Sequence, residues 1–354
     1  MARATNNSVD GWLKTKLQNY YLGPQREAVE ALAEAVKVAR EPEGKPLFAN
    51  PFRLDDLLVF DDEMLREIVT SGAPGLSVDE LARSLHNAPA PLMDRIASAL
   101  PQQQRARFLA LLARPAPPQA VEAARRQLLD HLFWELTYWK TPELYEELTE
   151  GESLHPDLFR QLRPDLRGKI VLDAGAGSGR ATFACLCQGA GHVYAVEPSL
   201  GLLRLLEGKL ARFAVPARQI TPLRGRFDAL PLDDRSVDTA LACSAFTAEP
   251  GQGGEAGLAE LQRVTRRGGK LILIWPRPED YHWLAEHGFQ YAALPVPEEM
   301  RVRFRSLQSA LRVARRFYAR DPAVARHLLR SRQPAVPFSL LSANPPHDYC
   351  WLPV

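Results

Sequence analysis

Hydrophobic positions divide the chain into two regions with different periodicities. Before about residue 165, apolar residues recur at intervals of three and four, as in Val29 to Val36 and Leu65 to Val69, which predicts amphipathic helices. Ser77 and Glu80 have the spacing of a capping box at a helix start. Prolines separate the apolar runs, where helices must stop. We therefore expect an all-α N-terminal region of short helices, whose Pro-containing turns suit an armadillo-like stack.

After about residue 165 the pattern changes to short apolar runs rich in β-branched residues. Each run is followed by a turn signal and then by a helical stretch, which predicts alternating strands and helices and a parallel sheet. Such a sheet places its ligand beyond the carboxyl ends of its strands. The runs span residues 169–173, 192–197, 239–243 and 270–275.

These patterns predict a division into domains. The boundaries give an N-terminal helical segment over 1–46, an all-α domain over 47–135, connecting or lid helices over 136–165, and an α/β domain over 166–354.

Composition narrows the classes of function. The 354 residues are 46% apolar and 24% charged, with a net charge of +2, which provides no strong field for nucleic acid. Four cysteines exclude a disulfide framework and favour a reducing compartment. The start of the sequence resembles no signal peptide, and no apolar run is long enough to span a membrane. We expect a cytoplasmic protein with no nucleic-acid, membrane or metal partner.

A glycine-rich turn provides the candidate chemistry. The first predicted strand leads into Asp173-Ala-Gly-Ala-Gly-Ser-Gly-Arg180, followed by a helix. Glycine permits positive φ and close approach of a ligand, and a helix start offers unpaired N–H groups. A dinucleotide site has the spacing G-x-G-x-x-G, whereas these glycines stand at strict two-residue intervals after an acid. The spacing disfavours a dehydrogenase.

The D-x-G-x-G-x-G pattern resembles motif I of class I S-adenosylmethionine-dependent methyltransferases. The segments Arg226–Asp238 and Arg267–Trp275 resemble later segments of that family, so the likeness covers about residues 141–300 and extends toward the C-terminus. The resemblance implies a Rossmann-like, mostly parallel sheet of seven strands, with S-adenosyl-L-methionine as the cofactor.

The resemblance also implies residue roles. Glu197, 18 residues after the last glycine of the turn, would accept both ribose hydroxyls through a bidentate, charge-assisted contact. Arg226 departs from the family, which has an adenine-reading Asp there; Phe227 and Asp228 would read adenine instead. The expected cofactor-binding residues are Asp173, Ala174, Gly175, Ala176, Gly177, Gly179, Glu197, Pro198, Phe227, Asp228 and Ser244.

Catalytic candidates are few, because methyl transfer from a sulfonium needs little acid–base assistance. Tyr145 and His155, in a lid-like entry segment, and Ser244, after the fourth predicted strand, could face the methyl group or the acceptor. Tyr145 could equally be a half-buried helix residue, and His155 a turn residue. An arginine cluster between 312 and 332 could hold an acidic substrate or form a solvated helix face. We expect Asn344–Tyr349 to be a C-terminal loop.

Residues 47–135 resemble the C-terminal domain of the flagellar motor switch protein FliG, chiefly through Phe52–Ile68 and Leu81–Ala88. That family's charged ridge is poorly kept, since His86 stands at its basic position and its paired acids fall near Ala110 and Leu111. The resemblance therefore implies a FliG-like helical module that could dock a protein partner or cap the acceptor site.

Two hypotheses for the whole chain follow. The first is a methyltransferase that transfers a methyl group from S-adenosylmethionine to a small-molecule or protein acceptor. The alternative is a non-catalytic adaptor with a cofactor-binding methyltransferase fold and a partner-docking helical domain.

Overall fold

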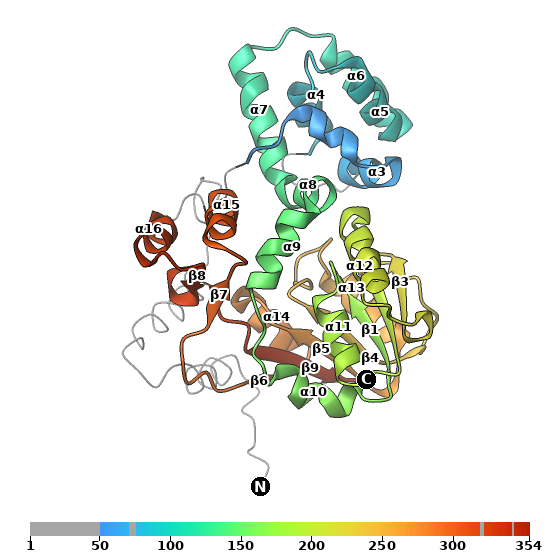
Figure 1. The fold of residues 1–354 in the computed structure, drawn as a ribbon. Helices are drawn as coiled ribbons and strands as arrows, with labels where there is room; N and C mark the ends of the chain where they lie inside the picture. Colours follow the sequence, from blue (N-terminus) through green and yellow to red (C-terminus); the bar gives the residue numbers. More distant parts are fainter. Residues whose placement is uncertain (1–49, 71–75, 319–321, 342) are drawn as a thin grey trace. The chain divides into compact units, whose positions relative to one another are not determined.

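The computed structural model describes residues 50–70, 76–318, 322–341 and 343–354 (Figure 1). The chain forms two compact units, Pro46–Tyr145 and a larger unit that includes Glu146–Val354. The N-terminal segment predicted over 1–46 lies outside the described residues. In the described part of the chain, no helix combines the length and the apolar composition that a membrane span requires.

The described part of the smaller unit consists of helices and turns. Ser77 caps a helix as its sequence predicts: its hydroxyl accepts from the Glu80 amide, and the Glu80 carboxylate accepts from the Ser77 amide. The apolar positions of the predicted Leu65 to Val69 run, which are Leu65, Ile68 and Val69, are buried. The elements are the 3₁₀ turn Leu54–Val59, α3 (Asp62–Thr70), α4 (Val78–Ser84), α5 (Ala90–Ala99), α6 (Gln102–Leu112), α7 (Pro118–His131) and α8 (Phe133–Lys140). The all-α character is as predicted, whereas the likeness to FliG remains a prediction.

The larger unit contains a seven-stranded sheet with the order β3-β2-β1-β4-β5-β9-β6. The first five strands in this order are parallel, and β9 runs antiparallel to both of its neighbours. The strands are β1 (Ile170–Ala174), β2 (His192–Glu197), β3 (Ile220–Arg224), β4 (Val237–Cys243), β5 (Thr265–Ile274), β6 (Gln290–Ala293) and β9 (Asp348–Pro353). This arrangement confirms the predicted Rossmann-like α/β fold.

Helices cover both faces of the sheet, because successive side chains of the buried strands point to opposite faces. Val171 packs with α10 (Leu158–Leu166) and α11 (Arg180–Cys187). Leu172 packs on the other face with α13 (Gly254–Val264) and α14 (Tyr281–Glu286). The remaining helices of the sheet region are α9 (Pro142–Gly151), which crosses the boundary between the units, and α12 (Leu200–Arg212).

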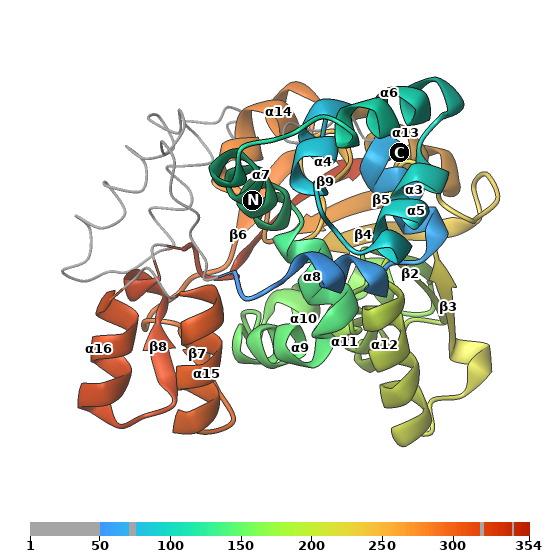
Figure 2. The same cartoon turned by 90° about the horizontal axis from the view of Figure 1, so that it is seen from above.

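A small substructure lies between β6 and β9 in the sequence. It pairs β7 (Arg301–Arg303) with β8 (Ala335–Pro337) and contains α15 (Leu307–Phe317) and α16 (Pro322–Ser331). Figure 2 shows the two helices beside this strand pair. We refer to residues 301–337 as the basic lobe.

The C-terminal segment differs from its prediction. The sequence predicts a loop over Asn344–Tyr349, but Asp348 and Tyr349 begin β9, which is inserted between β5 and β6. Tyr349 pairs with Ile274, and the Trp275 amide donates to the Asp348 carbonyl oxygen. The segment before β9 therefore lies at the carboxyl end of β5, at the edge of the sheet where a ligand is expected.

Candidate functional site

The glycine turn connects β1 to α11 through backbone that only glycine adopts easily. Gly175, Gly177 and Gly179 have φ values of +70°, +56° and +99°. A Cβ atom on Gly175 would lie 2.6 Å from the Ala245 Cβ, and one on Gly179 would lie 2.6 Å from the Leu206 Cδ1. A Cβ atom on Gly177 would meet no protein atom within 4 Å. Close packing requires glycine at positions 175 and 179, because a Cβ atom there would clash with neighbouring side chains. At Gly177 no such clash with a described residue exists, and the backbone faces open space.

Glu197, the last residue of β2, is joined to this turn. Its Oε2 accepts a hydrogen bond from the Gly177 amide at 2.8 Å, and its Oε1 accepts from the Ser199 amide at 2.9 Å. Burial raises the pKa of the Glu197 carboxyl to about 7, although both amides favour its ionised form. Each carboxylate oxygen has a further lone pair, so Glu197 can still accept hydrogen bonds from a ligand.

Asp173 lies under the turn and is fully buried. Its Oδ2 accepts a hydrogen bond from the Thr182 hydroxyl at 2.5 Å, whereas its Oδ1 has no hydrogen-bond partner among the described residues. Burial raises the pKa of Asp173 to about 6. A buried carboxylate oxygen without a donor is costly, and a cationic or N–H-bearing ligand would supply one.

The segment after β3 brings Phe227 to the same turn. The Phe227 Cζ would lie 3.2 Å from a Cβ atom on Gly175, and the ring packs edge-on against Phe246. Arg226 binds the Asp228 carboxylate through two hydrogen bonds, of 2.9 and 3.0 Å, and these bonds lower the pKa of Asp228. Arg226 therefore orients the acid two positions later.

The three catalytic candidates have different surroundings. Ser244 is exposed directly after β4, with a φ of +56°. The His155 Nε2 hydrogen-bonds the Pro295 carbonyl oxygen and its Nδ1 accepts from the Asp157 amide, so the chain itself uses both ring nitrogens. Tyr145 belongs to the other compact unit, where its ring packs against those of Trp134 and Tyr138.

A cluster that the sequence prediction missed lies beside the turn. The Arg180 Nη1 is 3.3 Å from the Glu152 carbonyl oxygen and 3.9 Å from its carboxylate, and the Arg180 Cζ is 5.7 Å from the centre of the Trp275 ring. The Tyr318 side chain hydrogen-bonds that of Glu152. Burial raises the pKa of Glu152 to about 7, and Arg180 partly opposes the rise.

Glu152 could have been found from the sequence. It stands in the lid-like entry segment between Tyr145 and His155, and Arg180 directly follows the last glycine of the turn. The missing information was spatial, because Tyr318 is 166 residues further along the chain and no local pattern joins it to Glu152.

A family of known proteins matches part of the sheet region. Residues 171–269 match the family described as a methyltransferase domain. This match supports S-adenosylmethionine as the cofactor.

Similar proteins are methyltransferases by name. Over 138 residues the chain is 38% identical to an uncharacterized methyltransferase of Mycobacterium tuberculosis, a match that covers 38% of this chain and 51% of that protein. An uncharacterized methyltransferase of Geobacillus kaustophilus is 29% identical over 149 residues, with coverages of 42% and 66%. The chain thus spans about half the length of the first curated relatives that it matches.

Among solved structures, a SAM-dependent methyltransferase of Aquifex aeolicus has a TM-score of 0.35 at 21% identity, covering 43% of this chain and 88% of that one. The YcgJ protein of Bacillus subtilis has a TM-score of 0.37 at 15% identity, with coverages of 56% and 95%.

Proposed function

We propose that this chain is an S-adenosylmethionine-dependent methyltransferase whose cofactor is held at the glycine turn. One juxtaposition carries the proposal: the open face of Gly177, the Glu197 carboxylate and the unpartnered Oδ1 of Asp173 meet at the carboxyl edge of β1 and β2. A ligand with ribose hydroxyls and a cationic amino-acid end suits two buried acids. A pyrophosphate would be repelled by the same acids.

Residue roles follow from these positions. Glu197 would accept from the ribose hydroxyls, and Asp173 would face the cationic end of the ligand. Phe227 and the Arg226-oriented Asp228 would border adenine. The remaining proposed cofactor contacts are Ala174, Gly175, Ala176, Gly177, Gly179, Pro198 and Ser244.

The acceptor side of the site is proposed to be the Glu152 cluster. When bound, S-adenosylmethionine supplies a methyl group on a positively charged sulfur. The Glu152 side chain, which is 16% exposed and hydrogen-bonded to Tyr318, would take the proton that an acceptor O–H or N–H loses. Arg180 pairs with Glu152 and lies over the Trp275 ring. Tyr145, His155 and Ser244 remain weaker catalytic candidates, and the acceptor is a small molecule or a protein.

Titration calorimetry on the full chain tests the cofactor. We expect saturable binding of S-adenosylmethionine and S-adenosylhomocysteine and none of NAD. Binding of NAD alone, or of no nucleoside, would refute the proposal. Binding without transfer to any acceptor would favour the adaptor hypothesis, which the comparisons do not support.

Glu152→Gln tests the acceptor side. Affinity for S-adenosylhomocysteine should stay within about twofold, while methyl transfer to an acceptor found by screening with methyl-labelled cofactor should fall by about 100-fold, the usual contribution of a positioned base. Glu207→Gln, at an exposed position on α12, is the matched control. Unchanged transfer in Glu152→Gln would remove Glu152 from the mechanism.

A further inference from the structure

The basic lobe has a charge that the rest of the chain does not share. Residues 301–332 contain ten arginines, no lysine and a single acid, Asp321, which gives this stretch a net charge of +9. Since the whole chain carries +2, all other residues together carry −7. Charge asymmetry of this size between parts of one chain points to an anionic ligand rather than to a requirement of folding.

Acidic neighbours neutralise only part of this charge. Arg305 pairs with Glu150 at 2.5 Å, and Arg312 pairs with Glu147 at 2.5 Å. Other arginines of the lobe are exposed and form no ion pair or side-chain hydrogen bond with any residue that the structure describes. These are Arg301, Arg303, Arg315, Arg330 and Arg332.

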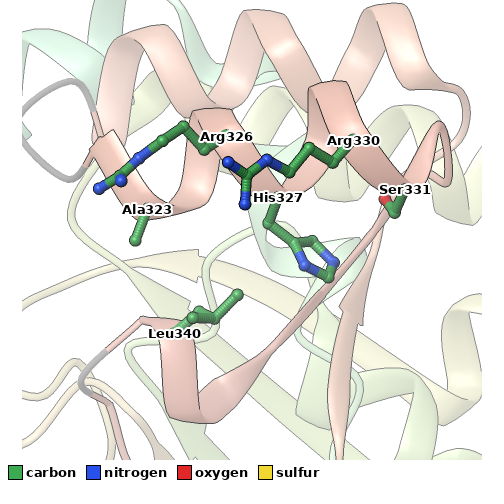
Figure 3. A pocket seen from close by; sticks show the side chains of 6 residues that line it. All are labelled: Ala323, Arg326, His327, Arg330, Ser331 and Leu340. Carbon is green, nitrogen blue, oxygen red and sulfur yellow. The ribbon is translucent and has the colours of Figure 1, made fainter.

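An open groove of about 530 Å³ lies in this basic surface. Figure 3 shows Arg326, His327 and Arg330 along one side of α16, with Leu340 across from them. Ala323 and Ser331 complete its lining. The volume falls in the range of small-molecule sites, about 300–1,000 Å³. Most of its polar lining groups are hydrogen-bond donors, while Ala323 and Leu340 add apolar contact.

Arg326 and Arg330 are four residues apart on α16, a spacing that places their side chains on the same side of the helix. His327 is held by a hydrogen bond between its Nε2 and the Ala335 carbonyl oxygen, at 3.1 Å.

We propose that this groove binds a phosphate ester. Two guanidinium groups match the oxygens of a phosphate better than a single carboxylate, because each guanidinium can donate two parallel hydrogen bonds. The groove is larger than a phosphate, and Leu340 and Ala323 offer apolar contact to the organic part of the ester. The proposal does not depend on methyl transfer.

Titration calorimetry with inorganic phosphate and phenyl phosphate on the full chain tests the proposal. Phenyl phosphate should bind saturably and more tightly than inorganic phosphate. The double variant Arg326→Gln/Arg330→Gln should weaken the binding of both by about tenfold or more, as expected for lost charge-assisted hydrogen bonds. Leu340→Ser should weaken only phenyl phosphate.

Two control variants test whether phosphate binding belongs to this groove. Arg204→Gln/Arg267→Gln removes two exposed arginines of the same unit outside the lobe and should change affinity by less than about twofold. Gly177→Val should leave phosphate binding intact, so a failure of the proposed function is distinguishable from a failure of this proposal.

Three outcomes would overturn the proposal: absence of phenyl phosphate binding at about 10 mM, near the weak limit of specific sites, equal losses in both double variants, or binding of a single-stranded oligonucleotide with no binding of phenyl phosphate. The last outcome would indicate an extended polyanion surface instead of a discrete site.

Discussion

The carboxyl edge of the sheet and the basic lobe differ in the sign and the burial of their charged side chains. At the sheet edge, Asp173, Glu197 and Glu152 are largely buried, and their pKa values are raised to about 6, 7 and 7. In the lobe, most of the described arginines are exposed, and Arg305 and Arg312 pair with glutamates. A cationic ligand at the sheet edge would favour the ionised forms of the acids there. The lobe would instead favour an anionic ligand. The net charge of +2 sums the acidic sheet edge and the basic lobe, so composition alone does not show that acids and arginines are separated in the molecule.

Gly177→Val should have the largest effect and should separate the two regions completely. A branched side chain would fill the open space above Gly177, so binding of S-adenosylhomocysteine should fall below detection while phosphate binding continues. Calorimetry measures both ligands.

Gly168→Val is a matched control for Gly177→Val. Gly168 also has a positive φ, +69°, and a Cβ atom there would meet no atom within 4 Å, but it precedes β1. Both variants should lose similar thermal stability, and only Gly177→Val should lose the cofactor. Wild-type affinity in a folded Gly177→Val protein would refute the assignment of the turn.

Glu197→Ala should weaken binding of S-adenosylhomocysteine by about 1.5–3 kcal/mol, the value of hydrogen bonds to a charged group. Since Glu197 also accepts from the Gly177 and Ser199 amides, part of this loss would come from a looser turn. Glu197→Gln keeps the shape of the side chain but removes its charge, so comparing it with Glu197→Ala separates the loss of the ribose contact from the loosening of the turn. Unchanged affinity in a folded Glu197→Ala protein would show that the ribose contact is wrong.

Affinity for S-adenosylmethionine should rise with pH. Below about pH 7 the raised pKa keeps Glu197 and Glu152 partly protonated, and a cation that favours their ionised forms must release protons on binding. Affinity should therefore increase between pH 6 and 8, by at most about tenfold per pH unit for each proton released. Calorimetry in buffers of different ionisation enthalpy measures the released protons. A flat profile would contradict the raised pKa values.

The same groups contribute to the pH dependence of folding with a definite sign. A carboxyl whose pKa is higher in the folded than in the unfolded protein binds more protons when folded. The contribution of Glu197 and Glu152 to the free energy of unfolding of the ligand-free protein should therefore fall as pH rises from about 4.5 to about 7. His131 and His155, whose pKa values are lowered by burial, contribute in the opposite direction, so denaturant titrations should compare the wild type with Glu152→Gln/Glu197→Gln. A difference in stability between the two proteins that does not change across this window would contradict the expectation.

Arg226→Ala should have the smallest effect, a change in cofactor affinity within about twofold, or less than about 0.5 kcal/mol. Its ion pair with Asp228 is partly exposed, and such pairs contribute little. A tenfold loss would show that the orientation of Asp228 is required for binding, which Asp228→Asn would then confirm.

The sequence predicted the parts of this fold that have local causes. Glycine spacing located the turn, the capping box located α4, and apolar runs located β1, β2, β4 and β5, because each depends on neighbouring residues. The role of β9 was missed because its partner residues in β5 and β6 lie 55 to 83 residues away in the sequence. The Glu152 cluster was missed for the same reason: Tyr318 and Trp275 reach it only through the tertiary fold.

Ser244 and Trp275 follow β4 and β5 with φ values of +56° and +55°, although neither is glycine. The Ser244 amide donates to the Ile274 carbonyl oxygen, so the two strained positions are directly connected. Each costs on the order of 1 kcal/mol that a glycine would not. Selection for thermal stability alone would therefore favour glycine at the exposed Ser244, but not at Trp275, whose ring packs against Phe338 and whose Nε1 donates to the Asn344 carbonyl oxygen. Ser244 is thus a position where a thermostability screen and an activity screen should choose different residues.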